Sequence, residues 1–202
     1  RRRDRERSSL GADLPTDPID ALAIEFSHPP WLVARWVTRF GADETRSLLE
    51  ANNREAPVVV RPWGVVREQL EAMLESAGVK VEDAPLMRDS IRVGGPVYLF
   101  GLGAFTQGHC FVQDPAATLV TEYAAIPAGA TVADLCSAPG GKSIELARHA
   151  ALVVSADLSP RRLERLNATR ARLDLANVVP VAFDAREPAI APVDAVLVDA
   201  PC

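Results

Sequence analysis

Hydrophobic and polar positions follow a regular rhythm in the second part of the chain. From Thr131 onward, short apolar runs alternate with longer amphipathic segments. Apolar runs of this length predict buried strands, and the amphipathic segments predict helices. The expected strands are 131–136, 152–157, 177–183 and 193–199, and the expected helices are 140–150 and 159–175. Strands that alternate with helices are typical of βαβ units, so we expect an α/β domain with a parallel sheet over residues 127–202.

The pattern before residue 127 is less regular and predicts a smaller module. Residues 1–27 are polar and contain Gly11, Pro15 and Pro18, which indicates a linker. Residues 28–126 are predicted to form one N-terminal module, in which two helices precede an α+β part with the order β-α-β-β. Its expected helices are 28–40, about 43–51 with Asp43 as N-cap, 63–78 and 114–125, and its expected strands are 56–62 and 79–83, with short strands and turns over 88–112.

Composition limits the classes of protein that fit. With 202 residues and 48 % hydrophobic positions, the chain can bury a packed core. It has no uninterrupted apolar stretch of about 18 residues and no apolar segment after its Arg-rich start, so we expect neither a membrane helix nor a secretory signal. Cys110, Cys136 and Cys202 form no CxxC pair, which favours a reducing cytoplasm and gives no indication of a metal site.

Charge is spread unevenly along the chain. The net charge is -5, which argues against a passive nucleic-acid binder, although the first seven residues hold five arginines and could touch phosphate. A solvated chain end is the favoured interpretation of that tail. Five further arginines belong to one expected helix, where they are compatible with a solvated face: Arg161, Arg162, Arg165, Arg170 and Arg172.

Candidate chemistry lies where the expected parallel strands end. Residues 134–142, DLCSAPGGK, join a strand to a helix, and their small side chains allow a ligand to approach the main chain. The segment is related to GxGxxG but does not copy it, and it lacks the spacing of a phosphate-binding P-loop. Asp157, Asp184 and Asp199 follow the next three strands. Alone, each would be equally well explained as a cap or turn residue; together they indicate a ligand site at the carboxyl edge of the sheet.

These motifs resemble those of one enzyme family. LCSAPGGK, DLSPRRLERL, FDAR and LVDAPC, in this order, resemble the RsmB/NOP-type RNA cytosine-5 methyltransferases. HPPWLVARWV, EANNREAP and FVQDPAATLV resemble the N-terminal part of the same family, best its bacterial rRNA members, so the resemblance covers about residues 27–202. It implies the first half of a Rossmann-like class I methyltransferase domain, preceded by a small α+β RNA-recognition-like module. It also implies RNA, most plausibly rRNA, as the partner, and we expect a monomer.

The resemblance implies roles for individual residues in binding S-adenosylmethionine. Asp157 would hold the ribose, Asp184 would contact the adenine, and Asp199 would lie near the transferred methyl group. The residues that would wrap the methionine end are Cys136, Ser137, Ala138, Pro139, Gly140, Gly141 and Lys142. Ser137 departs from the family pattern, where alanine is commoner, but both residues are small.

Two cysteines share the chemistry in this family. A thiolate adds to cytosine C6 and activates C5 for methylation, after which loss of the C5 proton releases the enzyme. A Thr-Cys motif supplies that nucleophile, and the cysteine of a Pro-Cys motif assists release of the product. Cys202 matches the releasing cysteine. We expect the Thr-Cys segment to lie beyond residue 202 and residues 1–202 alone to be inactive, because neither Cys110 nor Cys136 is placed to replace the nucleophile.

Three other functions remain open at this point. DNA cytosine-5 methyltransferases use the Pro-Cys cysteine as nucleophile, but they lack APGGK. RNA 2′-O-ribose methyltransferases can carry APGG, but they need no Pro-Cys. A non-catalytic module that binds a cofactor or RNA is the third possibility. The tryptophans Trp31, Trp36 and Trp63 could stack on bases, although packing against helix faces is favoured.

Overall fold

The structure is a computed structural model that describes residues 14–200. It consists of two compact units, Arg1–Ala56 and Pro57–Cys202, and each is described by itself. Across the described residues, every helix is too short or too polar to cross a membrane.

Within its described residues, 14–56, the first unit contains three helices, α2 (Pro18–Glu25), α3 (Pro30–Phe40) and α4 (Ala42–Asn52). Their shared core is formed by Ala23, Phe26, Val33 and Leu49. The sequence pattern predicts a linker over 1–27. That prediction is wrong for residues 18–25, which form α2, and residues 1–13 lie outside the described part. Asp17 begins α2 by accepting hydrogen bonds from the amides of residues 19 and 20, at 2.8 and 3.0 Å. Burial of Phe26 then fixes the helix in place.

The second unit begins with a small antiparallel sheet. Its elements are β1 (Val58–Pro62), α5 (Arg67–Ser76), β2 (Lys80–Asp83), β3 (Ile91–Gly94), the 3-10 helix η1 (Leu99–Gly101), α6 (Gly103–Thr106) and β4 (Cys110–Val112). The strand order is β2-β3-β1-β4, and Val60 of β1 pairs with Ile91 on one side and Val112 on the other. The predicted α+β module is confirmed, and the helical turns η1 and α6 replace part of the strands and turns expected over 88–112. The βαββαβ order makes the module ferredoxin-like.

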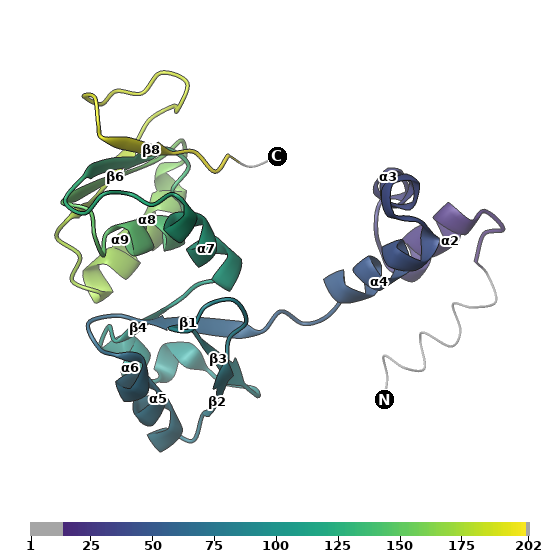
Figure 1. Ribbon diagram of the computed structural model, residues 1–202, viewed down its shortest axis with the longest axis horizontal. Coiled ribbons are helices and arrows are strands. Elements are labelled where there is room, and N and C mark those ends of the chain that lie inside the picture. Colours follow the sequence, from purple (N-terminus) through teal and green to yellow (C-terminus); the bar gives the residue numbers. More distant parts are fainter. Residues whose placement is uncertain (1–13, 201–202) are drawn as a thin grey trace. The chain divides into compact units, whose positions relative to one another are not determined.

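A parallel sheet forms the rest of this unit. Helix α7 (Pro115–Tyr123) leads into β5 (Thr131–Asp134), α8 (Gly141–Leu146), β6 (Leu152–Asp157), α9 (Pro160–Arg172), β7 (Val178–Ala182) and β8 (Ala195–Leu197) (Figure 1). The strand order is β7-β6-β5-β8, with every neighbouring pair parallel. This is the order of the first four strands of a Rossmann sheet, so the predicted fold class is confirmed. The carboxyl ends of all four strands therefore meet at one edge.

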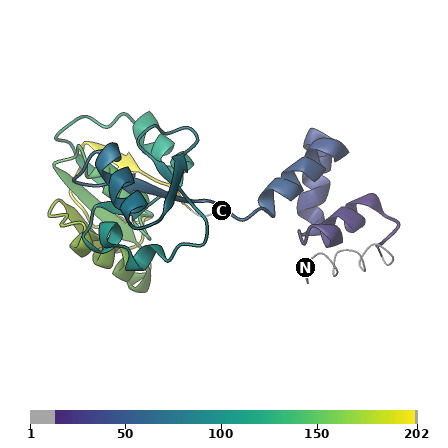
Figure 2. The ribbon, with the colours of Figure 1, turned by 90° about the horizontal axis from the view of Figure 1, so that it is seen from below.

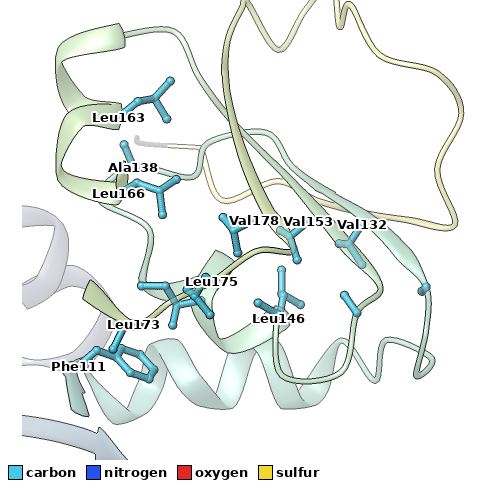
Figure 3. Close-up of a cluster of buried hydrophobic side chains, with 14 residues drawn as sticks. Phe111, Val132, Ala138, Leu146, Val153, Leu163, Leu166, Leu173, Leu175 and Val178 are labelled. Carbon is cyan, nitrogen blue, oxygen red and sulfur yellow. The ribbon is translucent and has the colours of Figure 1, made fainter. Parts of the chain in front are cut away.

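One hydrophobic cluster packs α8 and α9 onto the parallel sheet. Val132, Val153 and Val178 come from three adjacent strands and lie opposite leucines such as Leu146 and Leu166 (Figure 3). Each fully buried side chain of this kind contributes about 1.5–3 kcal/mol relative to an exposed one. Phe111 of β4 belongs to the same cluster. The small sheet is therefore anchored in the core of the parallel-sheet part.

Polar contacts hold the two sheets of this unit together as well. Arg61 of β1 and Glu145 of α8 form a buried ion pair at 2.6 Å. Arg148 contacts the same carboxylate at 2.9 Å and donates to the backbone oxygen of Pro62 at 2.7 Å. Trp63 donates to the backbone oxygen of Leu173 at 3.1 Å. In Figure 2 the small sheet and α5 lie directly in front of the parallel-sheet part.

Candidate cofactor and substrate site

A cavity of about 1400 Å³ lies at the carboxyl edge of the parallel sheet. It brings together nearly all the residues that the sequence predicts for the site, which are Cys136, Ser137, Ala138, Pro139, Gly141, Lys142, Asp157, Asp184 and Asp199. Gly140 is not part of this lining, and Cys202 falls outside the described residues. The small α+β module also contributes to the lining, with Phe105 of α6, Phe111 of β4 and Gln113 just after β4.

The loop between β5 and α8 is fastened on both sides by its own backbone. The amide of Leu135 donates to Leu197 of β8 at 3.0 Å, and the amide of Ser137 donates to Ala156 of β6 at 2.8 Å. Gly140 ends the loop with a φ of 113°, and a Cβ there would collide with the side chain of Leu166. Glycine is therefore required at this position for both its backbone and its missing side chain.

Asp157 ties this loop to the next strand. One carboxylate oxygen accepts from the amide of Ser159 at 2.9 Å, and the other accepts from the amide of Ala138 at 3.3 Å. Arg162 lies 3.2 Å from the same carboxylate and donates to the backbone oxygen of Ala138 at 2.8 Å. A carboxylate offers about four acceptor positions, so Asp157 retains capacity for a ligand hydroxyl. Asp157 therefore caps the turn before α9, through the amide of Ser159, and also lies at the cavity as predicted.

Asp134 also lines the cavity, although its motif predicts no individual role for it. Its side chain is 1 % exposed, and only one of its oxygens has a partner, the hydroxyl of Ser143 at 2.7 Å. Burial raises the pKa of the Asp134 carboxyl, while the Ser143 hydroxyl, the backbone amide of Cys136 and the charge of Lys142 oppose that rise. The Ser137 hydroxyl is also buried and has no partner among residues 14–200. The cavity lining therefore contains hydrogen-bonding groups that a polar ligand would satisfy.

The acids after the last two strands form ion pairs beside the cavity. Lys142 contacts Asp199 at 2.6 Å, which joins the end of the loop to the segment after β8. Asp184 pairs with Arg186 at 2.5 Å, and hydrogen bonds from Arg186 lower the pKa of the Asp184 carboxyl to about 2. Asp184 and Asp199 both line the cavity, at the sheet edge where the sequence places them, and each has a cationic neighbour.

Neither described cysteine is an activated nucleophile. Cys110 is fully buried, and burial raises its pKa to about 11. Burial, together with the carboxylates of Asp134 and Asp157, also raises the pKa of the Cys136 thiol. Because the thiolate is the reactive form, both side chains are poor nucleophiles near neutral pH.

Three further residues complete the site without having been predicted. Gln113 donates to the backbone oxygen of Gly141 at 2.9 Å and accepts from the Thr118 hydroxyl at 2.9 Å. Arg162 fixes the loop as described, and Leu158 lines the cavity with 72 % of its side chain exposed. Gln113 lies in the FVQDPAATLV stretch and Arg162 in DLSPRRLERL. Both residues therefore belong to motifs of the family, but the motifs do not indicate which backbone groups they contact.

Comparisons with known proteins agree with this architecture. Residues 125–202 match the family model described as 16S rRNA methyltransferase RsmB/F, and residues 28–99 match the model of the RsmF/B-like ferredoxin-like domain. Two relatives are ribosomal RNA small subunit methyltransferase B from Pseudomonas putida, 32 % identical over 211 residues, and from Vibrio cholerae, 31 % identical over 208 residues. The alignments include 100 % and 99 % of this chain and 47 % of each relative, so the chain spans about half their length.

Solved structures show the same arrangement. PH0851 superposes with a TM-score of 0.83 and 28 % identity, over 94 % of this chain and 45 % of that one. NSun6 from Pyrococcus horikoshii, solved with SFG, superposes with a TM-score of 0.76 over 84 % of this chain and 69 % of that one. Its identity is 16 %, so this second likeness concerns the fold alone.

Proposed function

The chain belongs to the RsmB/F family of rRNA methyltransferases, and from that premise we propose that its cavity binds S-adenosylmethionine for methylation of cytosine C5 in rRNA. The observation that carries the proposal is the convergence of the loop 136–142 with Asp157, Asp184 and Asp199 on one cavity. Ligand pockets commonly measure about 300–1000 Å³, so this cavity has room for the cofactor and part of a second substrate.

The lining fits the groups of that cofactor. Asp157 already accepts three hydrogen bonds and has about one acceptor position left for a ribose hydroxyl. The exposed Leu158 beside it offers an apolar surface to a base. The partnerless Asp134 oxygen supports binding of a cationic or hydrogen-bonding group deep in the cavity. When bound, S-adenosylmethionine supplies an electrophilic methyl group.

The residues of this chain would orient the reaction partners. The loop 136–142 holds the methionine end, Asp184 accepts from the adenine amine, and Asp199 lies at the edge where the methyl group is transferred. For Cys202 we propose release of the product, a role that rests on its Pro-Cys motif alone. The raised pKa values of Cys110 and Cys136 support a division of labour in which neither attacks the base.

Calorimetry with S-adenosylhomocysteine tests the cofactor assignment. Asp157→Ala should weaken binding by more than about tenfold, because hydrogen bonds to a charged group contribute about 1.5–3 kcal/mol each. Asp194→Ala is the matched control, since Asp194 also caps a backbone amide, that of Thr131 at 2.7 Å, but lies outside the cavity lining. Equal affinities of both variants, or binding of NAD in place of S-adenosylhomocysteine, would contradict the proposal.

Nucleoside mass spectrometry tests the reaction. The full gene product, incubated with S-adenosylmethionine and unmodified 16S rRNA, should produce 5-methylcytidine. A 2′-O-methylated nucleoside would instead establish the ribose methyltransferase alternative. Absence of any methylated nucleoside, with cofactor binding intact, would favour a non-catalytic binding module.

A further inference from the structure

The cavity extends from the cofactor loop to an aromatic cluster on the helical turns of the small α+β module. Phe100 of η1 and Phe105 of α6 line this second end, and their rings pack edge to face with centroids 5.1 Å apart. Phe100 is 61 % exposed, and the neighbouring Tyr98, whose ring centroid lies 6.2 Å away, is 77 % exposed. Large aromatic side chains are normally buried, so the exposed Phe100 in the cavity lining, with the exposed Tyr98 beside it, indicates a binding surface.

Arginines from α9 form the facing wall. Arg162, Arg165 and Arg172 line the cavity, and their spacing places them along one side of the helix. Arg172 lies 3.7 Å from the Phe105 ring centroid and donates to the backbone oxygens of Phe105 and Cys110. That contact fixes the aromatic cluster against the helix.

Arg165 differs from its two neighbours on this wall. Its side chain is exposed, and none of the ion pairs found within residues 14–200 includes it. Arg162 is paired with Asp157, and Arg172 is held by backbone carbonyls. The acid on the opposite wall, Asp114, accepts from the amide of Ala116 at 2.7 Å as the cap of α7. Arg165 is therefore available for an anion.

We propose that Phe100 and Arg165 form a subsite for single-stranded RNA, next to the cofactor end of the cavity. A nucleobase flanking the target would stack on Phe100, and a backbone phosphate would pair with Arg165. Aromatic platforms combined with basic side chains are how proteins hold single strands without reading a sequence. The inference rests on the proposed function, because continuity with the cofactor loop is what makes RNA the favoured occupant of this surface.

Fluorescence anisotropy with a labelled single-stranded RNA oligonucleotide tests the subsite. Phe100→Leu keeps the apolar surface but removes the stacking face, and it should weaken binding about fivefold or more. Arg165→Gln should also weaken binding and reduce the steepness of its salt dependence by about one phosphate contact. Matched controls are Phe40→Leu, an exposed phenylalanine of the first unit, and Arg161→Gln, an exposed α9 residue outside the cavity lining. Both controls should bind RNA as the unmodified protein does.

Calorimetry with S-adenosylhomocysteine on the same variants distinguishes failure of the RNA subsite from failure of the cofactor assignment. Retained cofactor affinity in Phe100→Leu and Arg165→Gln, with weakened RNA binding, supports the subsite. RNA binding that is equal in the four variants overturns the subsite and leaves the cofactor assignment standing. The same holds if the unmodified protein binds S-adenosylhomocysteine but no RNA. Failure to bind S-adenosylhomocysteine overturns the proposed function itself.

Discussion

Asp134 shows how one side chain can carry an electrostatic cost inside the site. It ends β5 next to the cofactor loop, and among the described residues Ser143 is the only side chain that donates a hydrogen bond to its carboxylate. Loss of hydration therefore outweighs the favourable contacts, and the pKa of the Asp134 carboxyl rises. A group of this kind destabilises the folded state once it is ionised.

Asp134→Asn should change how stability depends on pH. Because the folded-state pKa lies above the unfolded one, the unmodified protein loses stability as pH rises from the unfolded pKa through the folded pKa. Asparagine cannot ionise, so the variant should gain free energy of unfolding relative to the unmodified protein as pH rises from about 4. Urea unfolding between pH 4 and 8 measures the difference, and parallel pH profiles would contradict the expectation.

Single residues also mark where prediction from the sequence ends. The motif residues of loop 136–142 and three aspartates could be assigned because strand ends in a parallel sheet meet at one edge. Gln113 could not, because its partner Gly141 lies 28 positions further along the chain. Similarly, Asp43 is predicted as the N-cap of α4, whereas the N-cap is Gly41, two residues earlier.

Among the helices, α8 depends most visibly on a glycine at its start. Gly140 has a φ of 113°, which side-chain-bearing residues rarely adopt, and Leu166 of α9 occupies the space where a Cβ would go. The close approach of α9 to the loop is possible only without that atom.

Gly140→Ala should therefore lower the free energy of unfolding by about 2–4 kcal/mol, the sum of backbone strain and overpacking. Gly129→Ala is the control, since Gly129 also has a positive φ, 79°, but has open space around its Cβ position. That variant should lose only about 1–2 kcal/mol, from backbone strain. Equal losses in thermal or urea unfolding would show that contact with Leu166 is unimportant.

Elements with a strong hydrophobic period could be predicted, and short ones could not. The four parallel strands and α9 follow from apolar runs and a helical repeat. Helix α6 covers four residues and η1 three, too few to establish a period. Helix α2 begins with Asp17 as N-cap and Pro18 at its first position, which is a typical helix start. Because the residues before it are polar, the whole stretch 1–27 is predicted as a linker.

A buried charge pair joins β1 of the small sheet to α8 of the parallel-sheet part in the second unit. Arg61 and Glu145 are separated by 84 positions, so no local pattern in the sequence could pair them. Both side chains are nearly inaccessible, at 4 % and 7 % exposure. Removing one partner would leave the other charge buried and uncompensated.

Glu145→Gln should lower the free energy of unfolding by about 3–5 kcal/mol. The double variant Arg61→Met, Glu145→Leu should recover most of that loss, because two apolar side chains leave no buried charge. Glu25→Gln, which breaks the exposed Arg46–Glu25 pair at 2.8 Å, serves as control and should cost less than about 1 kcal/mol. Chemical denaturation of the three variants measures these values, and a double variant as unstable as Glu145→Gln would contradict the argument.

The hydrogen bond from Gln113 to Gly141 has a thermodynamic consequence. It joins the segment after β4, which belongs to the same module as Phe100 of the proposed RNA subsite, to the first residue of α8, on the side proposed for the cofactor. A ligand that orders one end of this bond reduces the entropy that remains to be lost at the other. By linkage, the factor by which RNA tightens cofactor binding must equal the factor by which the cofactor tightens RNA binding. A buried amide could thus make the two ligands cooperative without any contact between them.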